Sequence, residues 1–247
     1  MSAGRTWRGP LLMVIGLLVG WQALYAAVGD IALRSPADTI RYTVTLLGKE
    51  TFWPHLWESM RAFAVAIVIA VAAGVGIGLA LGFGRMAGQV FEPMLVALYS
   101  VPQVTLYPIL LLTFGLGISA KIAFGALHGF IPIALFTINA VRNVRPILVK
   151  TGRVLNYGTG DMVWRILIPA ALPEIFSGIR IGVSLTLIGT LLGEMFASQR
   201  GLGYMLMNGI GLHNVDVIMA ITFILIVFAA TVSSALLAVD RRLHRRV

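Results

Sequence analysis

The chain has 247 residues, of which 58% are hydrophobic and only 12% are charged, and its mean hydropathy is +0.91. Soluble domains carry about 25% charged residues, so this composition excludes a soluble protein and predicts one compact domain in a lipid bilayer. The lack of cysteine excludes disulfides and thiolate sites, and the net charge of +9 does not indicate nucleic-acid binding, because basic residues of membrane proteins gather on the cytoplasmic side.

Six stretches without a charged residue predict six transmembrane helices. Five of them hold 20 to 28 residues, and about 20 apolar residues cross a hydrocarbon core of about 30 Å. The sixth, between Arg180 and Glu194, holds 13 residues and must be extended, with Arg180 reaching toward the inner interface. We therefore expect an all-α integral membrane protein with helices over 9–29, 60–84, 103–117, 120–141, 175–195 and 217–239.

The distribution of charge predicts that both termini are cytoplasmic. Basic residues open the chain, close it and crowd one internal segment: Arg5, Arg8, Arg142, Arg145, Lys150, Arg153, Arg165, Arg241, Arg242, Arg245 and Arg246. Two ends on one side require an even number of crossings, which agrees with six. Residues 23–27 resemble a signal-peptide cleavage site, but the preceding apolar run exceeds the about 7–15 residues of a signal core, so we expect it to remain as the first helix.

The second predicted helix carries a glycine at every fourth position, at Gly74, Gly78 and Gly82. Small residues at that spacing lie on one face and let helix backbones approach closely in lipid. Glycine is also frequent in membrane helices generally. We favour the packing face.

Three prolines divide the region that follows. Pro93, Pro102 and Pro108 each remove a backbone donor and bend or end a helix. We expect a short cytoplasmic or interfacial segment near 86–100, a break at Val101-Pro102, and then the third membrane helix.

The segment 142–174 is too polar to span the membrane, yet its residues 164–172 are strongly apolar. Pro169 and Pro173 are expected to prevent one straight helix from forming here. An apolar and basic loop of this length indicates a surface for a partner protein, although basic amphipathic helices also lie flat in lipid headgroups.

A short helix is expected inside this loop. Gly158 and Gly160 would form the turn before it, and Asp161 would cap its free backbone N–H groups. The apolar side chains of Val163, Trp164, Ile166 and Leu167 would then be available to fill a groove on a partner.

The loop also contains a recognisable motif. It reads Lys150-Thr151-Gly152, then Asn156, then Ile166-Leu167-Ile168-Pro169. This resembles the cytoplasmic signature of binding-protein-dependent ABC importer permeases, which is Glu-Ala-Ala, three residues, Gly, nine residues and Ile-x-Leu-Pro. Ile166 and Pro169 match it, whereas Lys150 replaces the glutamate and Asn156 the glycine.

Further segments resemble the nitrate, sulfonate, taurine and bicarbonate subgroup of these permeases. They are Phe91-Glu92-Pro93, Val101-Pro102, Phe114-Gly115-Leu116-Gly117, Gly193-Glu194-Met195 and Gly201-Leu202-Gly203-Tyr204. The resemblance covers about 55–240. It implies the type I permease fold, with six membrane helices and a cytoplasmic coupling helix, in three regions: an N-terminal helix and outer segment (1–54), a permease domain with the other five membrane helices and the coupling helix (55–240), and a cytoplasmic basic tail (241–247).

The resemblance also implies partners. Two separate ATP-hydrolysing subunits would bind ATP and magnesium and would dock on the loop, so this chain would need no cofactor and no metal. A second copy of the chain would complete a homodimer in the bacterial inner membrane, and a solute-binding protein would deliver substrate near 30–59 and 196–216. The expected coupling residues are Lys150, Thr151, Gly152, Asn156, Gly158, Gly160, Asp161, Val163, Trp164, Arg165, Ile166 and Pro169.

The expected substrate is a small anion, such as a sulfonate or nitrate, or a vitamin precursor. Polar side chains that could line its path, or equally bond a neighbouring helix, are Asn139, Thr137, Ser184 and Thr186. Glu92, Glu194 and His128 are expected to be structural, because both carboxylates fall near predicted interfaces and the histidine has no second ligand at helical spacing.

Two other classes of function remain as alternatives. A self-contained secondary transporter or channel would need coupling charges at mid-bilayer, which the uncharged helices hardly offer. An intramembrane enzyme would need a nucleophile or metal cluster, and the sequence contains neither His-Glu-x-x-His nor Gly-x-Ser-x-Gly. Gly48-Lys49 lacks the earlier glycine and the following Ser or Thr of a phosphate-binding loop, so ATP hydrolysis must come from a partner.

Overall fold

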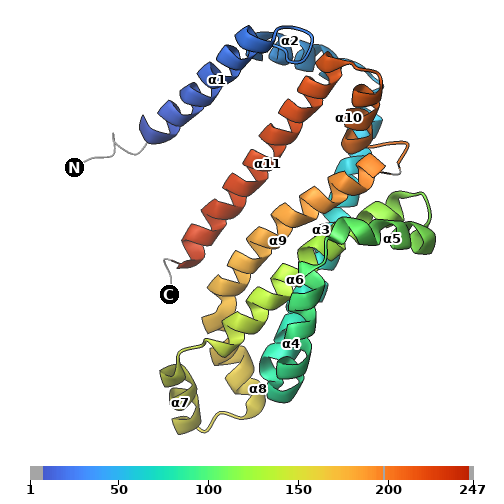
Figure 1. The fold of residues 1–247 in the computed structure, drawn as a ribbon. Helices are drawn as coiled ribbons and strands as arrows, with labels where there is room; N and C mark the ends of the chain where they lie inside the picture. Colours follow the sequence, from blue (N-terminus) through green and yellow to red (C-terminus); the bar gives the residue numbers. More distant parts are fainter. Residues whose placement is uncertain (1–7, 197, 245–247) are drawn as a thin grey trace.

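The computed structural model describes residues 8–196 and 198–244, and every regular element in these ranges is a helix (Figure 1). Arg5, Arg245 and Arg246 lie outside the described residues. In chain order the elements are α1 (Arg8–Val28), α2 (Pro36–Leu47), α3 (Trp53–Phe83), α4 (Arg85–Ser100), η2 (Gln103–Leu106), α5 (Tyr107–Phe114), α6 (Ile118–Arg142), α7 (Pro146–Val154), α8 (Thr159–Met162), η3 (Val163–Leu167), α9 (Ile168–Phe196), α10 (Leu202–Gly211) and α11 (Val215–His244).

Within the described ranges, length and composition allow up to six membrane spans, if one bent pair is counted as a span. Five of these helices are long and apolar enough to cross by themselves, and the bent pair consists of α4 and the helical stretch of η2 and α5, which meet at 91°. The expected break at Val101-Pro102 is confirmed, and the expected helix over 103–117 is present as η2 and α5, but this helix is too short to cross by itself, since α5 has 8 residues and rises only about 12 Å. The bend follows from Pro102, which disfavours a helical conformation for the preceding Val101, and Val101 is extended at ψ 134°.

Two element boundaries differ from expectation for reasons visible in the sequence. The third helical element, α3, begins at Trp53 rather than 60, because Pro54 suits the first turn of a helix. The segment before it, for which no helix was expected, contains α2. Ser35 caps α2 by accepting a hydrogen bond of 3.1 Å from the Asp38 N–H, and Pro36 occupies its first turn. At the other end, α11 continues through Asp240 to His244, so the expected tail begins inside a helix.

The two prolines of the long loop do not interrupt the chain as expected. Instead α8, η3 and α9 form one continuous helical run over Thr159–Phe196. Directly before Pro169 lies the π-turn η3, in which the Ile168 N–H donates to the Val163 carbonyl. The wider spacing of a π-turn relieves the clash that a proline makes with the preceding turn, and Pro173 then lies inside α9.

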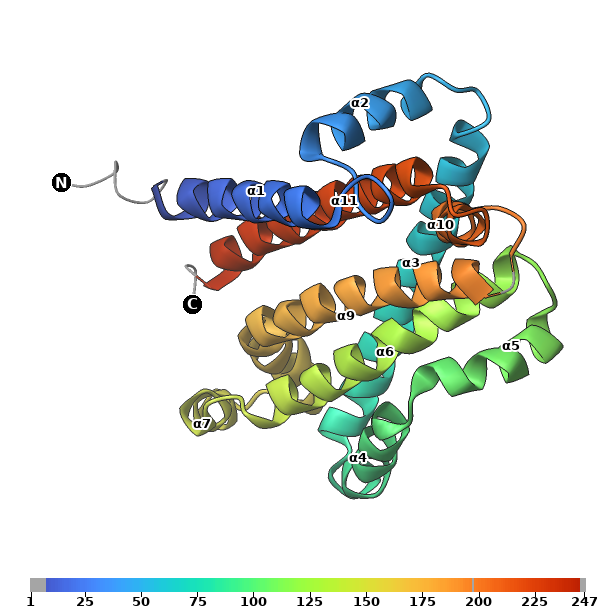
Figure 2. The same cartoon turned by 45° about the horizontal axis from the view of Figure 1, so that its top comes forward.

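The core of the molecule is a layer of three long helices, α3, α6 and α9, which cross closely in both ribbon views (Figures 1 and 2). Gly74, Gly78 and Gly82 of α3 all face α6, and a Cβ added at Gly78 would lie 2.4 Å from the Thr137 Cβ. At Gly129 of α6, a Cβ would lie 2.0 Å from the Thr186 Oγ1 of α9 and 3.0 Å from the Ala70 Cβ of α3. Small residues thus bring all three backbones together.

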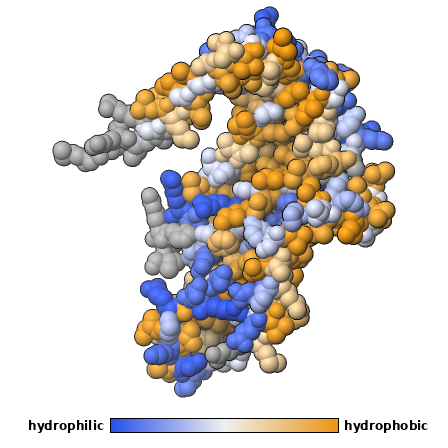
Figure 3. Space-filling model, viewed as in Figure 1, coloured by the Kyte–Doolittle hydropathy of each residue, from blue (hydrophilic) through white to orange (hydrophobic). Residues whose placement is uncertain are grey.

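The termini of the core helices define two ends of the molecule. We call the end with α7 and α8 the α7 end, and the end with α2 and α10 the α10 end (Figure 1). Hydrophilic residues gather at the α7 end, while an apolar surface covers much of the molecule between the ends (Figure 3). The helix α1 stands apart from the core (Figure 1), and apolar side chains are exposed along it.

Candidate functional site

The expected coupling loop folds as a helical hairpin at the α7 end. Asn156 makes the sharp turn after α7, with a left-handed φ of 53°. The Asn156 N–H donates to the Arg153 carbonyl and the Tyr157 N–H to the Gly152 carbonyl, both at 3.0 Å. This pair of bonds is a Schellman cap, whose turning residue is normally glycine and sometimes asparagine. Asn156 therefore preserves the conformation that the family's glycine would supply.

Gly152 sets the spacing between the two arms of the hairpin. It is buried, and a Cβ at this position would lie 2.6 Å from the Ile166 Cδ1 and 2.8 Å from the Met162 side chain. A larger residue here would displace the ends of these two side chains, which fill the space between α7 and η3. Gly152 thus positions the surface from within rather than belonging to it.

Trp164 is the largest apolar side chain that the hairpin exposes, with 72% of its surface accessible. Ile147, Val154 and Leu155 of the α7 arm are also exposed, whereas Val163, Ile166 and Leu167 are only partly accessible. Tryptophan next to arginine is typical of the energetically dominant residues in protein interfaces. The hairpin therefore offers apolar groups that the bundle itself does not use.

The short helix α8 corrects two expectations. Asp161 does not cap α8, because Gly158 occupies the N-cap position and no side chain bonds there. Asp161 lies in the first turn instead and pairs with Arg165 at 2.9 Å. Gly160 is likewise inside α8 rather than in the preceding turn. Arg165 also lies 5.8 Å from the ring centre of Tyr157, so its guanidinium already has contacts within this chain.

A cavity of about 520 Å³ opens between the hairpin and the ends of α6 and α9. Arg145, Thr151, Tyr157 and Arg165 line it together with Pro169 and Glu174. Lys150 is exposed, and the Thr151 hydroxyl donates to the Ile147 carbonyl at 2.9 Å. The hairpin thus combines exposed apolar groups with a polar recess.

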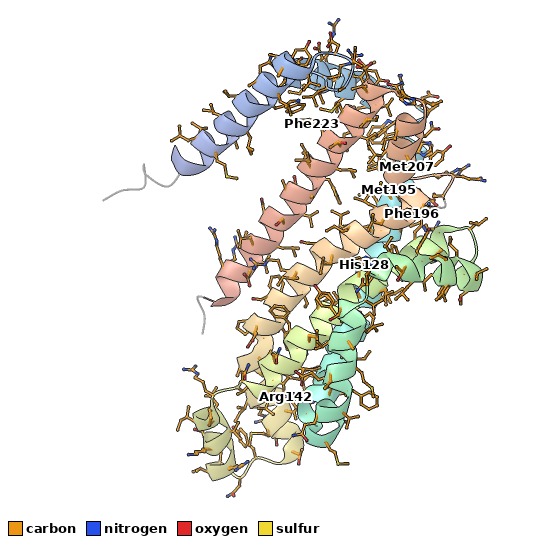
Figure 4. All side chains as sticks on the ribbon, viewed as in Figure 1. His128, Arg142, Met195, Phe196, Met207 and Phe223 are labelled. Atoms are coloured by element: carbon orange, nitrogen blue, oxygen red, sulfur yellow. The ribbon has the colours of Figure 1, made fainter. Side chains whose placement is uncertain are left out.

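Two ion pairs link the membrane helices close to the hairpin. Arg142, the last residue of α6, pairs with Glu92 of α4, and Gly88 leaves the space that its guanidinium needs (Figure 4). Arg180 of α9 pairs with Asp240 of α11 at 3.2 Å. These charges join helices near the α7 end, which agrees with a structural role for Glu92.

The four polar candidates for a substrate path fall into two groups. Thr137 and Thr186 are fully buried between core helices and bond carbonyls of their own helices at 2.7 and 2.8 Å, so they do not face a path in this conformation. Asn139 and Ser184 are exposed. Ser184 lines a cavity of about 360 Å³ with Tyr99, Arg180 and Ser233.

His128 lies in the middle of α6 and packs within the protein (Figure 4). Its Nδ1 is 3.0 Å from the Phe124 carbonyl, and its ring meets that of Phe124 edge to face. A Cβ on Gly189 of α9 would lie 2.7 Å from the imidazole. Among the residues that the structure describes, no group of three possible metal ligands occurs.

Sequence reasoning missed the small residues on the partners of α3. Gly125 and Gly129 of α6, and Gly178 and Gly182 of α9, show the same four-residue spacing and pack at the same interfaces. The spacing was available in the sequence and would have predicted them.

The comparisons with known proteins agree with this geometry. Residues 70–247 match the family described as the binding-protein-dependent transport system inner membrane component. The chain belongs to this family. It is therefore the permease component of an ABC importer, a multi-pass inner-membrane protein that is not itself catalytic, and the ATPase is a separate subunit.

Three curated relatives of this permease are named for different solutes. It is 27% identical to the taurine transport system permease protein TauC of Escherichia coli, over 96% of this chain and 92% of the relative. It is 31% identical to the putative aliphatic sulfonates transport permease protein SsuC of Escherichia coli, over 92% and 88%. It is 36% identical to the riboflavin transport system permease protein RibX of Chloroflexus aurantiacus, over 82% and 76%.

A solved structure supports the fold. The permease aligns with a chain of the inward-facing MetNI methionine ABC transporter at a TM-score of 0.66, with 19% identity, over 76% of this chain and 93% of that one. The all-α type I permease architecture is thus confirmed.

Proposed function

We propose that this permease imports a small organic anion, and that sulfonates are its first candidate substrates. The observation that carries the proposal is the similarity over nearly the whole chain to permeases named for taurine and for aliphatic sulfonates. The basic charge of the chain is not part of the support, because topology accounts for it. A vitamin is the second candidate, since the riboflavin permease shares 36% identity over a shorter part of the chain.

The helical hairpin at the α7 end is the proposed docking site for the ATPase subunit. Trp164 would enter a groove on that subunit, while Lys150 and the outward edge of Arg165 would meet acidic groups at its rim. The exposure of Trp164 and its apolar neighbours supports this role. Thr151, Gly152, Asn156, Gly158, Gly160, Asp161, Val163, Ile166 and Pro169 would shape the site, mainly by fixing the hairpin.

The proposed complex contains two copies of the permease, two ATPase subunits and one solute-binding protein. The α7 end would face the cytoplasm, both termini would lie on that side, and the α10 end would face outward to receive the binding protein. ATP and magnesium would be held by the ATPase subunits alone. This arrangement needs no cofactor in the permease.

Affinity purification of the tagged permease in mild detergent, followed by mass spectrometry, tests the docking site. Trp164→Ala should remove most of the ATPase subunit from the purified complex. Trp57→Ala is the matched control, because Trp57 is 71% exposed but belongs to the α10 end of α3. Equal recovery of the ATPase with both variants would reject the hairpin as the docking site.

The same complex, reconstituted with its binding protein in proteoliposomes, tests the substrate. ATP-driven uptake should be highest for taurine or an alkanesulfonate among a panel that also includes nitrate and riboflavin. Preferred uptake of riboflavin would favour the second candidate. Uptake by the permease without any ATPase would overturn the importer assignment in favour of a secondary transporter.

A further inference from the structure

The α10 end contains a buried carboxyl group that the transport proposal does not use. Glu194 lies near the end of α9 and is completely inaccessible to solvent. Both of its carboxyl oxygens lie 2.8 Å from the hydroxyl of Ser59 on α3, and one accepts a 2.9 Å hydrogen bond from the Gly203 N–H of α10. One side chain thus joins three helices.

These bonds replace a missing helix cap. The first N–H groups of any helix need acceptors, and they usually find one in a side chain at the N-cap. The N-cap of α10 is Gly201, which has no side chain to offer. Ser59 accepts from the Leu202 N–H at 2.8 Å, and Glu194 accepts from Gly203, so α3 and α9 cap α10 from outside.

The turn before α10 fits directly onto the carboxyl group. Gly201 has a φ of 121°, which favours glycine, and a Cβ there would lie 2.3 Å from the Glu194 Cδ. Gly203 is equally constrained, since its Cβ would lie 2.7 Å from the Glu194 Cβ. The pattern Gly-Leu-Gly in the sequence therefore reflects contact with Glu194.

A second set of bonds holds the same turn. Lys121, at the start of α6, donates to the Arg200 carbonyl at 2.8 Å and pairs with Glu58 of α3 at 3.2 Å. The Gly201 N–H donates to His55 Nδ1 at 3.2 Å. All three core helices thus converge on residues 200–203.

The helix that carries Glu194 also carries the proposed docking surface. The run from Thr159 to Phe196 is unbroken, and about 45 Å separates Trp164 from Glu194 along its axis at 1.5 Å per residue. Figure 4 shows Met195 and Phe196 at its far end, close to α10 with Met207. A movement of the hairpin would therefore reach α10 through one continuous helix.

We infer that Glu194 is a positioning residue that makes α10 move together with α9, so that the outward surface around α10 responds to the ATPase at the opposite end. This inference rests on the proposed function of the hairpin. It assigns Glu194 no contact with the substrate or with the ATPase. Its role is to couple the position of α10, which the binding protein would contact, to the position of the hairpin at the α7 end.

Glu194→Gln in the reconstituted full complex tests the inference, with ATPase activity measured with and without the binding protein. The amide keeps the size of the side chain, but only its oxygen can accept a hydrogen bond, whereas both carboxyl oxygens of Glu194 do so. Basal ATPase activity should stay within twofold of wild type, while stimulation by the binding protein should fall at least fivefold. Glu50→Gln is the control, because Glu50 is an exposed carboxylate near the same end, and it should behave as wild type.

Ser59→Ala provides a second, milder variant that removes only a hydroxyl group, and it should also reduce stimulation more than basal activity. Normal stimulation in both variants, or an equal loss of basal and stimulated activity in an intact complex, would overturn the inference. If wild-type permease itself recruits no ATPase, the proposed function fails instead. The two failures are therefore distinguishable.

Discussion

Gly78 of α3 packs directly against Thr137 of α6 and leaves no room for a side chain. A Cβ added to Gly78 would lie only 2.4 Å from the Thr137 Cβ. Thr137 is itself fully buried, with its hydroxyl bonded to its own helix. Gly78→Ala should therefore separate two core helices and destabilise the permease by about 1–3 kcal/mol, the usual cost of overpacking. Thermal unfolding in detergent, monitored by circular dichroism, measures the effect.

Gly76 provides the control for this prediction. It lies two residues away on the same helix, and nothing approaches its added Cβ within 4 Å. Gly76→Ala should leave the midpoint of unfolding unchanged or raise it slightly, because alanine favours the helical state over glycine. Equal destabilisation by both substitutions would show that helix propensity, not the contact with Thr137, decides the outcome.

The close contact between α3 and α6 could be predicted from sequence because glycine spacing alone encodes it. Gly74, Gly78 and Gly82 lie on one face in any α-helix, whatever the rest of the chain does. Pro102 also acted locally, since it fixes the conformation of the residue before it. Features of this kind are readable without a tertiary structure.

Other features depended on contacts that no local pattern contains. Glu194 was placed near an interface, but its complete burial follows from Ser59 and Gly203 on two other helices. Pro173 was expected to interrupt a helix, yet the π-turn before Pro169 and the long run of α9 override that tendency. The start of α2 was readable from Ser35 and Asp38, although no helix was expected there from the sequence.

Asn156 leads to a prediction about the departure from the family motif. Since its φ is 53°, Asn156→Gly should be neutral or stabilise the hairpin by a few tenths of a kcal/mol, whereas Asn156→Val should cost about 1–2 kcal/mol, because a β-branched residue resists this conformation. Recovery of the ATPase subunit should follow the same order. Asn143→Val is the control, since Asn143 has an ordinary φ of −88°. Retention of the ATPase with Asn156→Val would mean that the turn does not shape the docking surface.

The helix α2 leads to a prediction about the membrane boundary. Its residues fall into three sectors. The buried sector contains Thr39, Thr43 and Leu46, and the exposed apolar sector contains Ile40, Val44 and Leu47. The third sector is exposed and polar, with Asp38, Arg41 and Thr45. A helix with these three faces fits the boundary between protein, lipid and water, where exposed tryptophans such as Trp53 and Trp57 also accumulate. We therefore expect α2 to lie in the lipid headgroup region.

Cysteine variants at adjacent positions check this placement. A polarity-sensitive fluorophore at Val44→Cys should emit in the blue and be quenched by brominated lipids, while the same probe at Thr45→Cys should report water. If both probes report water until the binding protein is added, the apolar sector belongs to that protein's docking surface instead of the membrane.

The pair between Arg142 and Glu92 gives the last prediction, because it joins the end of α6 to α4 directly before the hairpin begins. Both side chains are partly exposed, so the pair should contribute modestly to stability, with a coupling free energy of about 0.5–2 kcal/mol in a double-mutant cycle. Arg142→Gln and Glu92→Gln should each lower ATP-driven uptake more than they lower the unfolding midpoint, because the pair fixes α4 relative to the helix that leads to the docking site. The double variant should do no further harm beyond the single ones. Fully additive losses would instead show that each residue acts alone and that the pair does not connect the bent span of α4 and α5 to the hairpin.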